Sequence, residues 1–102
     1  MRNGIKIAGR SGDPIVAAES GKVVYSGSGL IGYGRLIIIK HNDNYLSAYA
    51  HNRTILVDEG DQVTKGQKIA EMGTANSGES LLHFEIRRDG KPVDPQRLLK
   101  RR

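Results

Sequence analysis

Three segments of this chain place ionisable side chains where they could act together on one surface. His83 and Glu85 are two residues apart in a run, residues 81–87, that alternates like a β-strand. His51 closes a second alternating run, and Lys6 lies in a third. An imidazole can ligate a metal ion or transfer a proton, and a neighbouring carboxylate can assist either task. If the three strands share one sheet, these side chains form the candidate functional site.

The alternation assigns each run an inward and an outward face. Leu82, Phe84 and Ile86 are uniformly apolar, so we expect them to face the core. In the second run, the apolar side chains predict that Leu46, Ala48 and Ala50 face inward. The outward-facing residues would then line one polar surface: Lys6, Tyr49, His51, Leu81, His83 and Glu85.

Glycine-rich turns separate the short apolar runs, and this pattern predicts an all-β domain. The predicted strands are Ile5–Ala8, Ile15–Ala18, Lys22–Ser26, Arg35–Lys40, Tyr45–Ala50, Thr54–Val57, Gln67–Met72 and Leu81–Arg87. Only Pro95–Lys100 has a helical pattern, in the form of one turn. His41 precedes Asn-Asp-Asn, which predicts a solvated turn. Closely spaced strands of this kind favour a compact antiparallel sandwich or barrel.

The composition fits one domain over residues 1–102, with a short basic tail at 95–102. The chain has 16 Lys and Arg against 11 Asp and Glu, a net charge of +5. The tail could meet phosphate, lipid or an acidic protein, but a solvated terminus is the favoured interpretation. The chain offers no aromatic stacking platform, so no nucleic-acid partner is expected. It has no cysteine for a disulfide and no apolar run near the ~20 residues of a transmembrane segment.

Five motifs resemble, in order, those of the lysostaphin/LytM-type zinc endopeptidases. The matching segments are Gly4–Ala8 (G-x-D-I-A), Gly32–Gly34 (G-Y-G), Tyr49–His51 (Y-x-H), Gly60–Ala70 (G-D-x-V-x-x-G-Q-x-I) and Leu82–Arg87 (L-H-F-E-I-R). Within that family, the chain is most similar to the C-terminal domain of murein hydrolase activators of the NlpD type. The resemblance implies the lysostaphin-like fold, an antiparallel β-sandwich or barrel with a duplicated hybrid motif.

The resemblance also implies a degenerate metal site. Active family members bind zinc through H-x-x-x-D and the second histidine of H-x-H, while two further histidines assist the attacking water. Arg2, Lys6 and Leu81 replace three of these residues, and only His51 and His83 remain. A catalytic zinc needs three protein ligands, and cationic side chains are poor ones. We therefore expect no bound metal, no cofactor and no catalytic residues.

A family groove without its metal is expected to bind rather than cleave. The resemblance implies a non-catalytic activator of a periplasmic, zinc-dependent N-acetylmuramoyl-L-alanine amidase, acting in cell separation. The amidase's regulatory region would bind this groove: Lys6, Tyr33, Tyr49, His51, Leu81 and His83. Leu81 would supply an apolar patch for a hydrophobic anchor or, alternatively, only local packing. The implied location is the periplasm, with an outer-membrane anchor upstream of this chain.

Two alternatives remain open from the sequence. One is an active zinc endopeptidase that uses His51, His83 and Glu85 as atypical ligands, although these residues contain no close-spaced ligand pair of the usual kind. The other is a scaffold module that binds peptidoglycan directly. The first predicts metal-dependent cleavage by the chain alone, and the second predicts binding to sacculi without an amidase.

Overall fold

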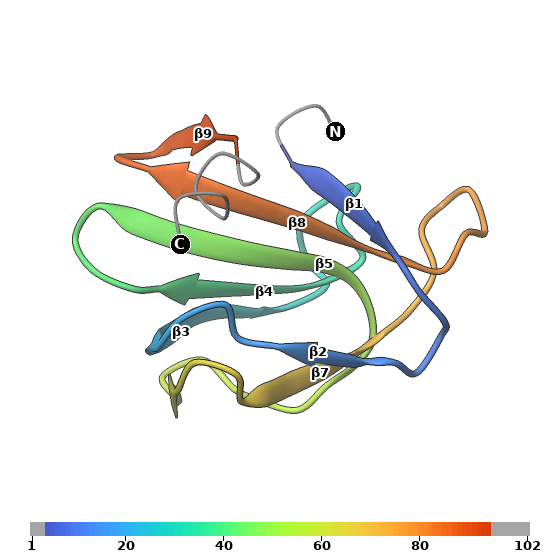
Figure 1. Ribbon diagram of the computed structural model, residues 1–102, viewed down its shortest axis with the longest axis horizontal. Helices are drawn as coiled ribbons and strands as arrows, with labels where there is room; N and C mark the ends of the chain where they lie inside the picture. The colour runs from blue at the N-terminus through green and yellow to red at the C-terminus, as the bar shows by residue number, and fades with distance from the viewer. Residues whose placement is uncertain (1–3, 95–102) are drawn as a thin grey trace.

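The computed structural model describes residues 4–94, and no helix occurs in that range (Figure 1). Nine strands follow one another: β1 (Ile5–Ala8), β2 (Pro14–Val16), β3 (Gly21–Gly27), β4 (Arg35–Lys40), β5 (Tyr45–Ile55), β6 (Gln62–Val63), β7 (Lys68–Met72), β8 (Leu81–Arg88) and β9 (Lys91–Val93). Among the described residues, no helix is long and apolar enough to cross a membrane.

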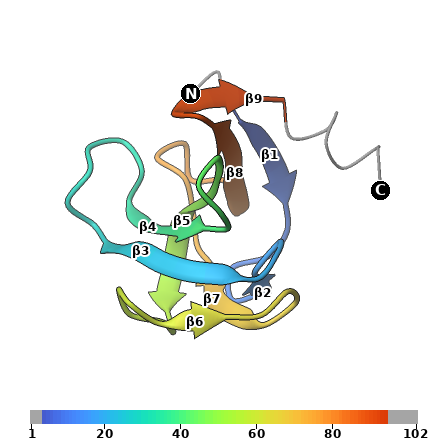
Figure 2. The same ribbon diagram turned by 90° about the vertical axis from the view of Figure 1, so that its left-hand side faces the viewer.

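All strand pairs are antiparallel, and one continuous path runs β1-β8-β5-β4-β3-β6. β2 pairs with β7, and β7 also pairs with the end of β5, so the sheet folds back over itself. In both views β2 and β7 lie along the side opposite β8 and β9 (Figures 1 and 2). The core fills the space between these layers, and the predicted all-β antiparallel fold is confirmed.

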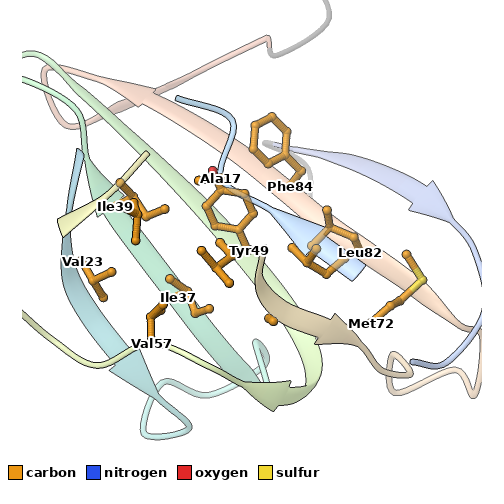
Figure 3. Packing of buried hydrophobic residues seen from close by; sticks show 13 residues of the cluster. Ala17, Val23, Ile37, Ile39, Tyr49, Val57, Met72, Leu82 and Phe84 are labelled. Carbon is orange, nitrogen blue, oxygen red and sulfur yellow. The ribbon is translucent and has the colours of Figure 1, made fainter. Parts of the chain in front are cut away.

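The core consists mainly of aliphatic side chains with two aromatic rings. The rings of Tyr49 and Phe84 lie 5.4 Å apart, centroid to centroid, and Leu82 packs nearby (Figure 3). The buried cluster comprises Ile15, Ala17, Val23, Ile37, Ile39, Tyr49, Val57, Val63, Ile69, Ala70, Met72, Leu82 and Phe84. The prediction that the apolar face of residues 81–87 points inward is therefore confirmed.

The predicted faces of β5 are wrong. Tyr49 lies opposite Phe84 in the β5–β8 register, so the two residues share the core face. Ala48 and Ala50 lie opposite Glu85 and His83 on the other face. Counting apolar residues favoured the alanine face, but a tyrosine ring buries far more apolar area than a methyl group. Tyr49 is accordingly 1% exposed and belongs to the core.

The phenol of Tyr49 reaches the core because a hydrogen-bonded chain satisfies its hydroxyl. That hydroxyl accepts from the Ala18 backbone N–H at 2.9 Å and lies 2.7 Å from Ser47 Oγ. Ser47 Oγ in turn lies 2.7 Å from His41 Nε2, and His41 Nδ1 lies 2.8 Å from the Ser20 carbonyl oxygen. A carbonyl oxygen only accepts, so Nδ1 carries the proton, and a neutral His41 accepts from Ser47. His41 thus braces the sheet. The predicted turn is present, with Asn42, Asp43 and Asn44 exposed, but His41 itself is half-buried rather than solvated.

The predicted strands otherwise match the observed ones, with differences at their ends. The two separate runs predicted between Tyr45 and Val57 are one eleven-residue strand, β5. The short strands β6 and β9 were not predicted, because two or three residues cannot show an alternation. The predicted helical turn at Pro95–Lys100 and the basic tail lie outside the described residues, so both stay predictions.

Candidate functional site

The centre of the candidate site is a chain of three side chains along β8, of which two are buried and the third, Arg87, is half-buried. His83 Nε2 lies 2.8 Å from Glu85 Oε2, and Arg87 donates from Nη2 to the other carboxylate oxygen, Oε1, at 3.2 Å. His83 and Glu85 are only 3% and 2% exposed. Because a carboxylate only accepts, His83 donates its Nε2 proton to Glu85. That nitrogen therefore has no lone pair left for a metal.

Gly4 covers this pair at very close range. A methyl group added at Gly4 would stand 2.8 Å from both His83 Nε2 and Glu85 Cγ, and 2.5 Å from the Phe84 carbonyl oxygen. Any larger residue would have to displace the start of β1. The glycine thus explains how two polar side chains become buried on the face away from the core.

Lys6 and Ala50 flank His83 on the neighbouring strands. Lys6 is its partner on β1 and Ala50 its partner on β5. Directly opposed residues project from the same face of a sheet, so all three belong to the groove face. The lysine is exposed, whereas the alanine is buried at 1% exposure. Lys6 is therefore the charge that an incoming ligand meets first.

His51 reaches the groove face through a local reversal of the backbone. It follows Tyr49 by two residues, so regular alternation would send it into the core. Its φ is 67°, a left-handed conformation that turns the chain. Its amide donates to the Tyr33 carbonyl and its carbonyl accepts from Gly73, both at 2.9 Å. The imidazole centroid consequently lies 6.4 Å from that of His83.

The environment of His51 favours its neutral form. Burial lowers the pKa of the imidazole most, and electrostatic repulsion from the neighbouring His83 and Lys6 side chains lowers it further. Neutral imidazole keeps one nitrogen as an acceptor, so His51 can receive a hydrogen bond from a bound partner.

Tyr33 lies beside His83 and belongs to the β3–β4 loop, residues 28–34. Its ring centroid lies 6.5 Å from that of His83. The bond from the His51 amide to the Tyr33 carbonyl fastens this loop to β5. The structure therefore brings together four of the sequence-predicted residues: Lys6, Tyr33, His51 and His83.

Two other sequence-predicted groove residues are buried. Tyr49 points into the core, which contradicts its predicted place on the polar surface. Leu81 is 5% exposed, so its side chain is packed and presents no open apolar patch. Of the two interpretations of Leu81, local packing fits the structure. Arg2 lies outside the described residues.

The residues present do not fit a catalytic zinc. The fold implies three protein ligands, yet Lys6 holds one ligand position as an ammonium group with no lone pair. His83, the surviving ligand, donates its Nε2 proton to Glu85 and could offer only Nδ1, which is one ligand where three are needed. Within residues 4–94 no three His, Cys, Asp or Glu side chains are grouped so that they could hold a metal ion. Arg87 was not predicted as part of the site, although its two-residue spacing from Glu85 was a readable signal.

Comparisons with known proteins agree on one family. Residues 1–95 match the model of peptidase family M23. The chain is 61% identical over 102 residues to the lipoprotein NlpD/LppB homolog of Pseudomonas aeruginosa, covering all of this chain and 34% of that protein. It is 59% identical over 99 residues to the murein hydrolase activator NlpD of Escherichia coli K12, covering 97% of this chain and 26% of that one. The chain thus spans about a third or less of these relatives.

A solved structure supports the fold independently. The catalytic domain of the antimicrobial peptidase lysostaphin from Staphylococcus simulans superposes with a TM-score of 0.90 at 30% identity. The match covers 98% of this chain and 80% of that one. The backbone of a peptidase is therefore present around a site whose side chains differ in kind.

Proposed function

Because the chain belongs to peptidase family M23 yet has a lysine at a ligand position and keeps only His83 of the expected zinc ligands, we propose that it activates another enzyme rather than cleaving peptidoglycan. That enzyme would be a cell-wall N-acetylmuramoyl-L-alanine amidase of the zinc-dependent class. The observation that carries the proposal is Lys6 directly opposite His83, a cation at a position where the resemblance implies a zinc ligand. A cation beside a single remaining ligand disfavours zinc, while the backbone fold of the peptidase is retained.

The relatives support the same proposal. The Escherichia coli protein is named a murein hydrolase activator, and the Pseudomonas aeruginosa protein is named a lipoprotein. The envelope is the corresponding location for this chain, and within it we propose the periplasm, with an anchor supplied by a region outside this sequence. The whole chain, 1–102, would act as one domain.

The proposed mechanism is a population shift in the amidase. The groove would bind the amidase's regulatory region through the Lys6 cation, the Tyr33 ring and the acceptor nitrogen of His51, above the buried His83. To open an amidase that is closed nearly all the time, the groove must prefer the open state by a few kcal/mol. Lys6 favours an acidic partner segment.

Dye release from labelled peptidoglycan tests the proposal. The chain alone, the amidase alone and the two together are compared at equal concentrations. We expect release by the mixture well above that by the amidase, and no release by the chain alone. Cleavage by the chain alone would support the endopeptidase with atypical ligands instead. Retention on sacculi without an effect on the amidase would support the scaffold module.

A charge-reversal variant tests the groove itself. Lys6→Glu should weaken stimulation by about tenfold or more, because it replaces the exposed cation with a like charge against an acidic segment. Lys65→Glu, an equal charge change at an exposed turn, is the matched control. Equal stimulation by both variants would refute the groove.

A further inference from the structure

The most exposed large apolar side chain of the described residues stands at the tip of the β3–β4 loop. Ile31 is 99% exposed, and its neighbour Leu30 is 44% exposed. In Figure 2 this loop projects from the left-hand side of the molecule, away from the sheet. A side chain exposed to this extent buries almost no apolar surface within its own domain, so it adds almost nothing to the stability of the fold. Two adjacent aliphatic residues held in solvent are typical of a contact surface for another molecule.

The loop is held in place despite its glycines. Gly29 donates its amide to the Tyr25 hydroxyl at 2.9 Å. At the other end, the Tyr33 carbonyl accepts from the His51 amide at 2.9 Å. Bonds at both ends limit the freedom that the tip would lose on binding, which lowers the entropic cost of using it.

A cationic pocket opens at the base of the same loop. It has a volume of about 320 Å³ and is lined by Gly27, Ser28, Arg35, Arg53, Thr54 and Ile55. The Arg53 guanidinium pairs with Glu71 at 3.2 Å. Arg35 Nη1 instead donates to the neutral backbone carbonyl of Arg53, a bond that leaves its positive charge uncompensated. Its remaining N–H groups suit a carboxylate.

The backbone at Arg35 is fixed, so the pocket is preformed. Asn52 donates its Nδ2 protons to the Arg35 carbonyl at 3.0 Å and to the Tyr49 carbonyl at 2.8 Å. These bonds fasten the start of β4 to β5. Arg35 lines this pocket together with Ser28 and Thr54, two residues whose hydroxyl groups can also donate.

We propose that the loop tip and this pocket form one docking surface for an acidic amphipathic segment of the amidase. An apolar side chain of that segment would pack on Leu30 and Ile31, and a carboxylate would enter the pocket beside Arg35. Ile31 follows Ser28 by three positions, so the Cα atoms of these two residues are at most about 11 Å apart. Two turns of one helix cover that distance. The inference rests on the proposed function only for the identity of the partner.

The chemistry favours a protein over a lipid surface. A pocket with one uncompensated guanidinium and two hydroxyls can hold a single carboxylate, whereas a membrane presents a plane of headgroups. The groove with Lys6 is tied to the same loop through Tyr33, so one partner could contact both. Binding to anionic vesicles is the competing outcome that the experiment separates.

Equilibrium binding of the full chain to the purified amidase tests the docking surface. Ile31→Ser and Arg35→Gln should each weaken binding by about tenfold, the loss of an interface anchor. Arg35→Gln should also flatten the dependence of affinity on salt. Val16→Ser, another aliphatic residue that is 46% exposed, and Lys65→Gln are matched controls, each expected within twofold of the parent. Circular dichroism should show the same fold for all five proteins.

The outcomes separate this inference from the proposed function. Unchanged binding by Ile31→Ser and Arg35→Gln, with stimulation still lost in Lys6→Glu, would overturn the docking surface and leave the activator role standing. A parent chain that binds the amidase through these residues without stimulating it would overturn the activator role alone. No binding by the parent chain would overturn both. Sedimentation with phosphatidylglycerol vesicles that Ile31→Ser abolishes, beside unchanged amidase binding, would assign the surface to lipid.

Discussion

Replacing Tyr49 by phenylalanine separates a core role from a groove role for that residue. The substitution removes one oxygen and keeps the ring that packs on Phe84 at 5.4 Å between centroids. The half-buried Ala18 amide then loses its acceptor, which costs about 1–3 kcal/mol. Ser47 keeps its bond with His41, so its contribution to the loss is small. We expect the free energy of unfolding to fall by about 2 kcal/mol.

Thermal or urea denaturation measures that loss directly. For a domain of this size, about 2 kcal/mol corresponds to a fall of about 10 °C in the melting temperature. Tyr45→Phe is the matched control: its half-exposed ring lies under the Arg88 guanidinium at 5.8 Å, a contact that does not need the hydroxyl. We expect its stability to change by no more than about 0.5 kcal/mol.

The activity of Tyr49→Phe distinguishes the two roles. Its hydroxyl lies on the core face, so stimulation of the amidase should stay within twofold of the parent at a temperature where both are folded. A variant that keeps full stability but loses stimulation would refute the core assignment and restore the sequence-based one.

Three further predictions concern the buried pair and its surroundings. Gly4→Ala should displace β1 and lower the free energy of unfolding by several kcal/mol, because the new methyl group would overlap a backbone carbonyl. Gly27→Ala is the control and should be tolerated, because its methyl group would have no contact under 3.4 Å. Calorimetry compares the stability of the two variants. The purified chain should contain well under one zinc per molecule by elemental analysis, even after incubation with zinc, and stoichiometric zinc would contradict the donor assignment. Folding lowers the pKa of His51, so as pH falls the unfolded chain binds a proton on this imidazole before the folded chain does. The contribution of neutral His51 to the free energy of unfolding is therefore fully present above the usual pKa of 6.5, and it is lost as pH falls through the lower pKa of the folded state. Stability should therefore decline more steeply from about pH 7 to 5 than in His51→Asn, which tolerates the positive φ; parallel slopes in urea titrations would refute this.

The sequence was sufficient for the fold because its strands alternate cleanly and its turns carry glycine and asparagine. β1 and β4 match their predicted bounds, and the apolar face of β8 was predicted correctly. β5 was harder to predict, since both of its faces carry small or amphipathic residues. Which face becomes the core depends on the register with β8, and register is a property of the folded pair.

The residues of the site could be predicted from the sequence, but their hydrogen bonds and burial could not. The positions of Lys6 and His83 follow from motifs, and their opposition in the β1–β8 register agrees with that. The sequence does not show that His83 donates its Nε2 proton to Glu85, or that both side chains are buried. That burial comes from the close approach of Gly4, a contact between segments about 80 residues apart. The reversal at His51 was equally hidden, because it depends on a single backbone angle.

Strand β8 has a consequence for how such a domain can change over time. Its even-numbered residues from Leu82 to Ile86 pack in or against the core, while His83 and Glu85 lie on the opposite face. The two faces of the strand therefore carry separate sets of residues, and one set can be substituted while the other is kept. In such a fold, residues on the site face can be replaced one at a time without disturbing core packing, so the same backbone can serve either catalysis or binding.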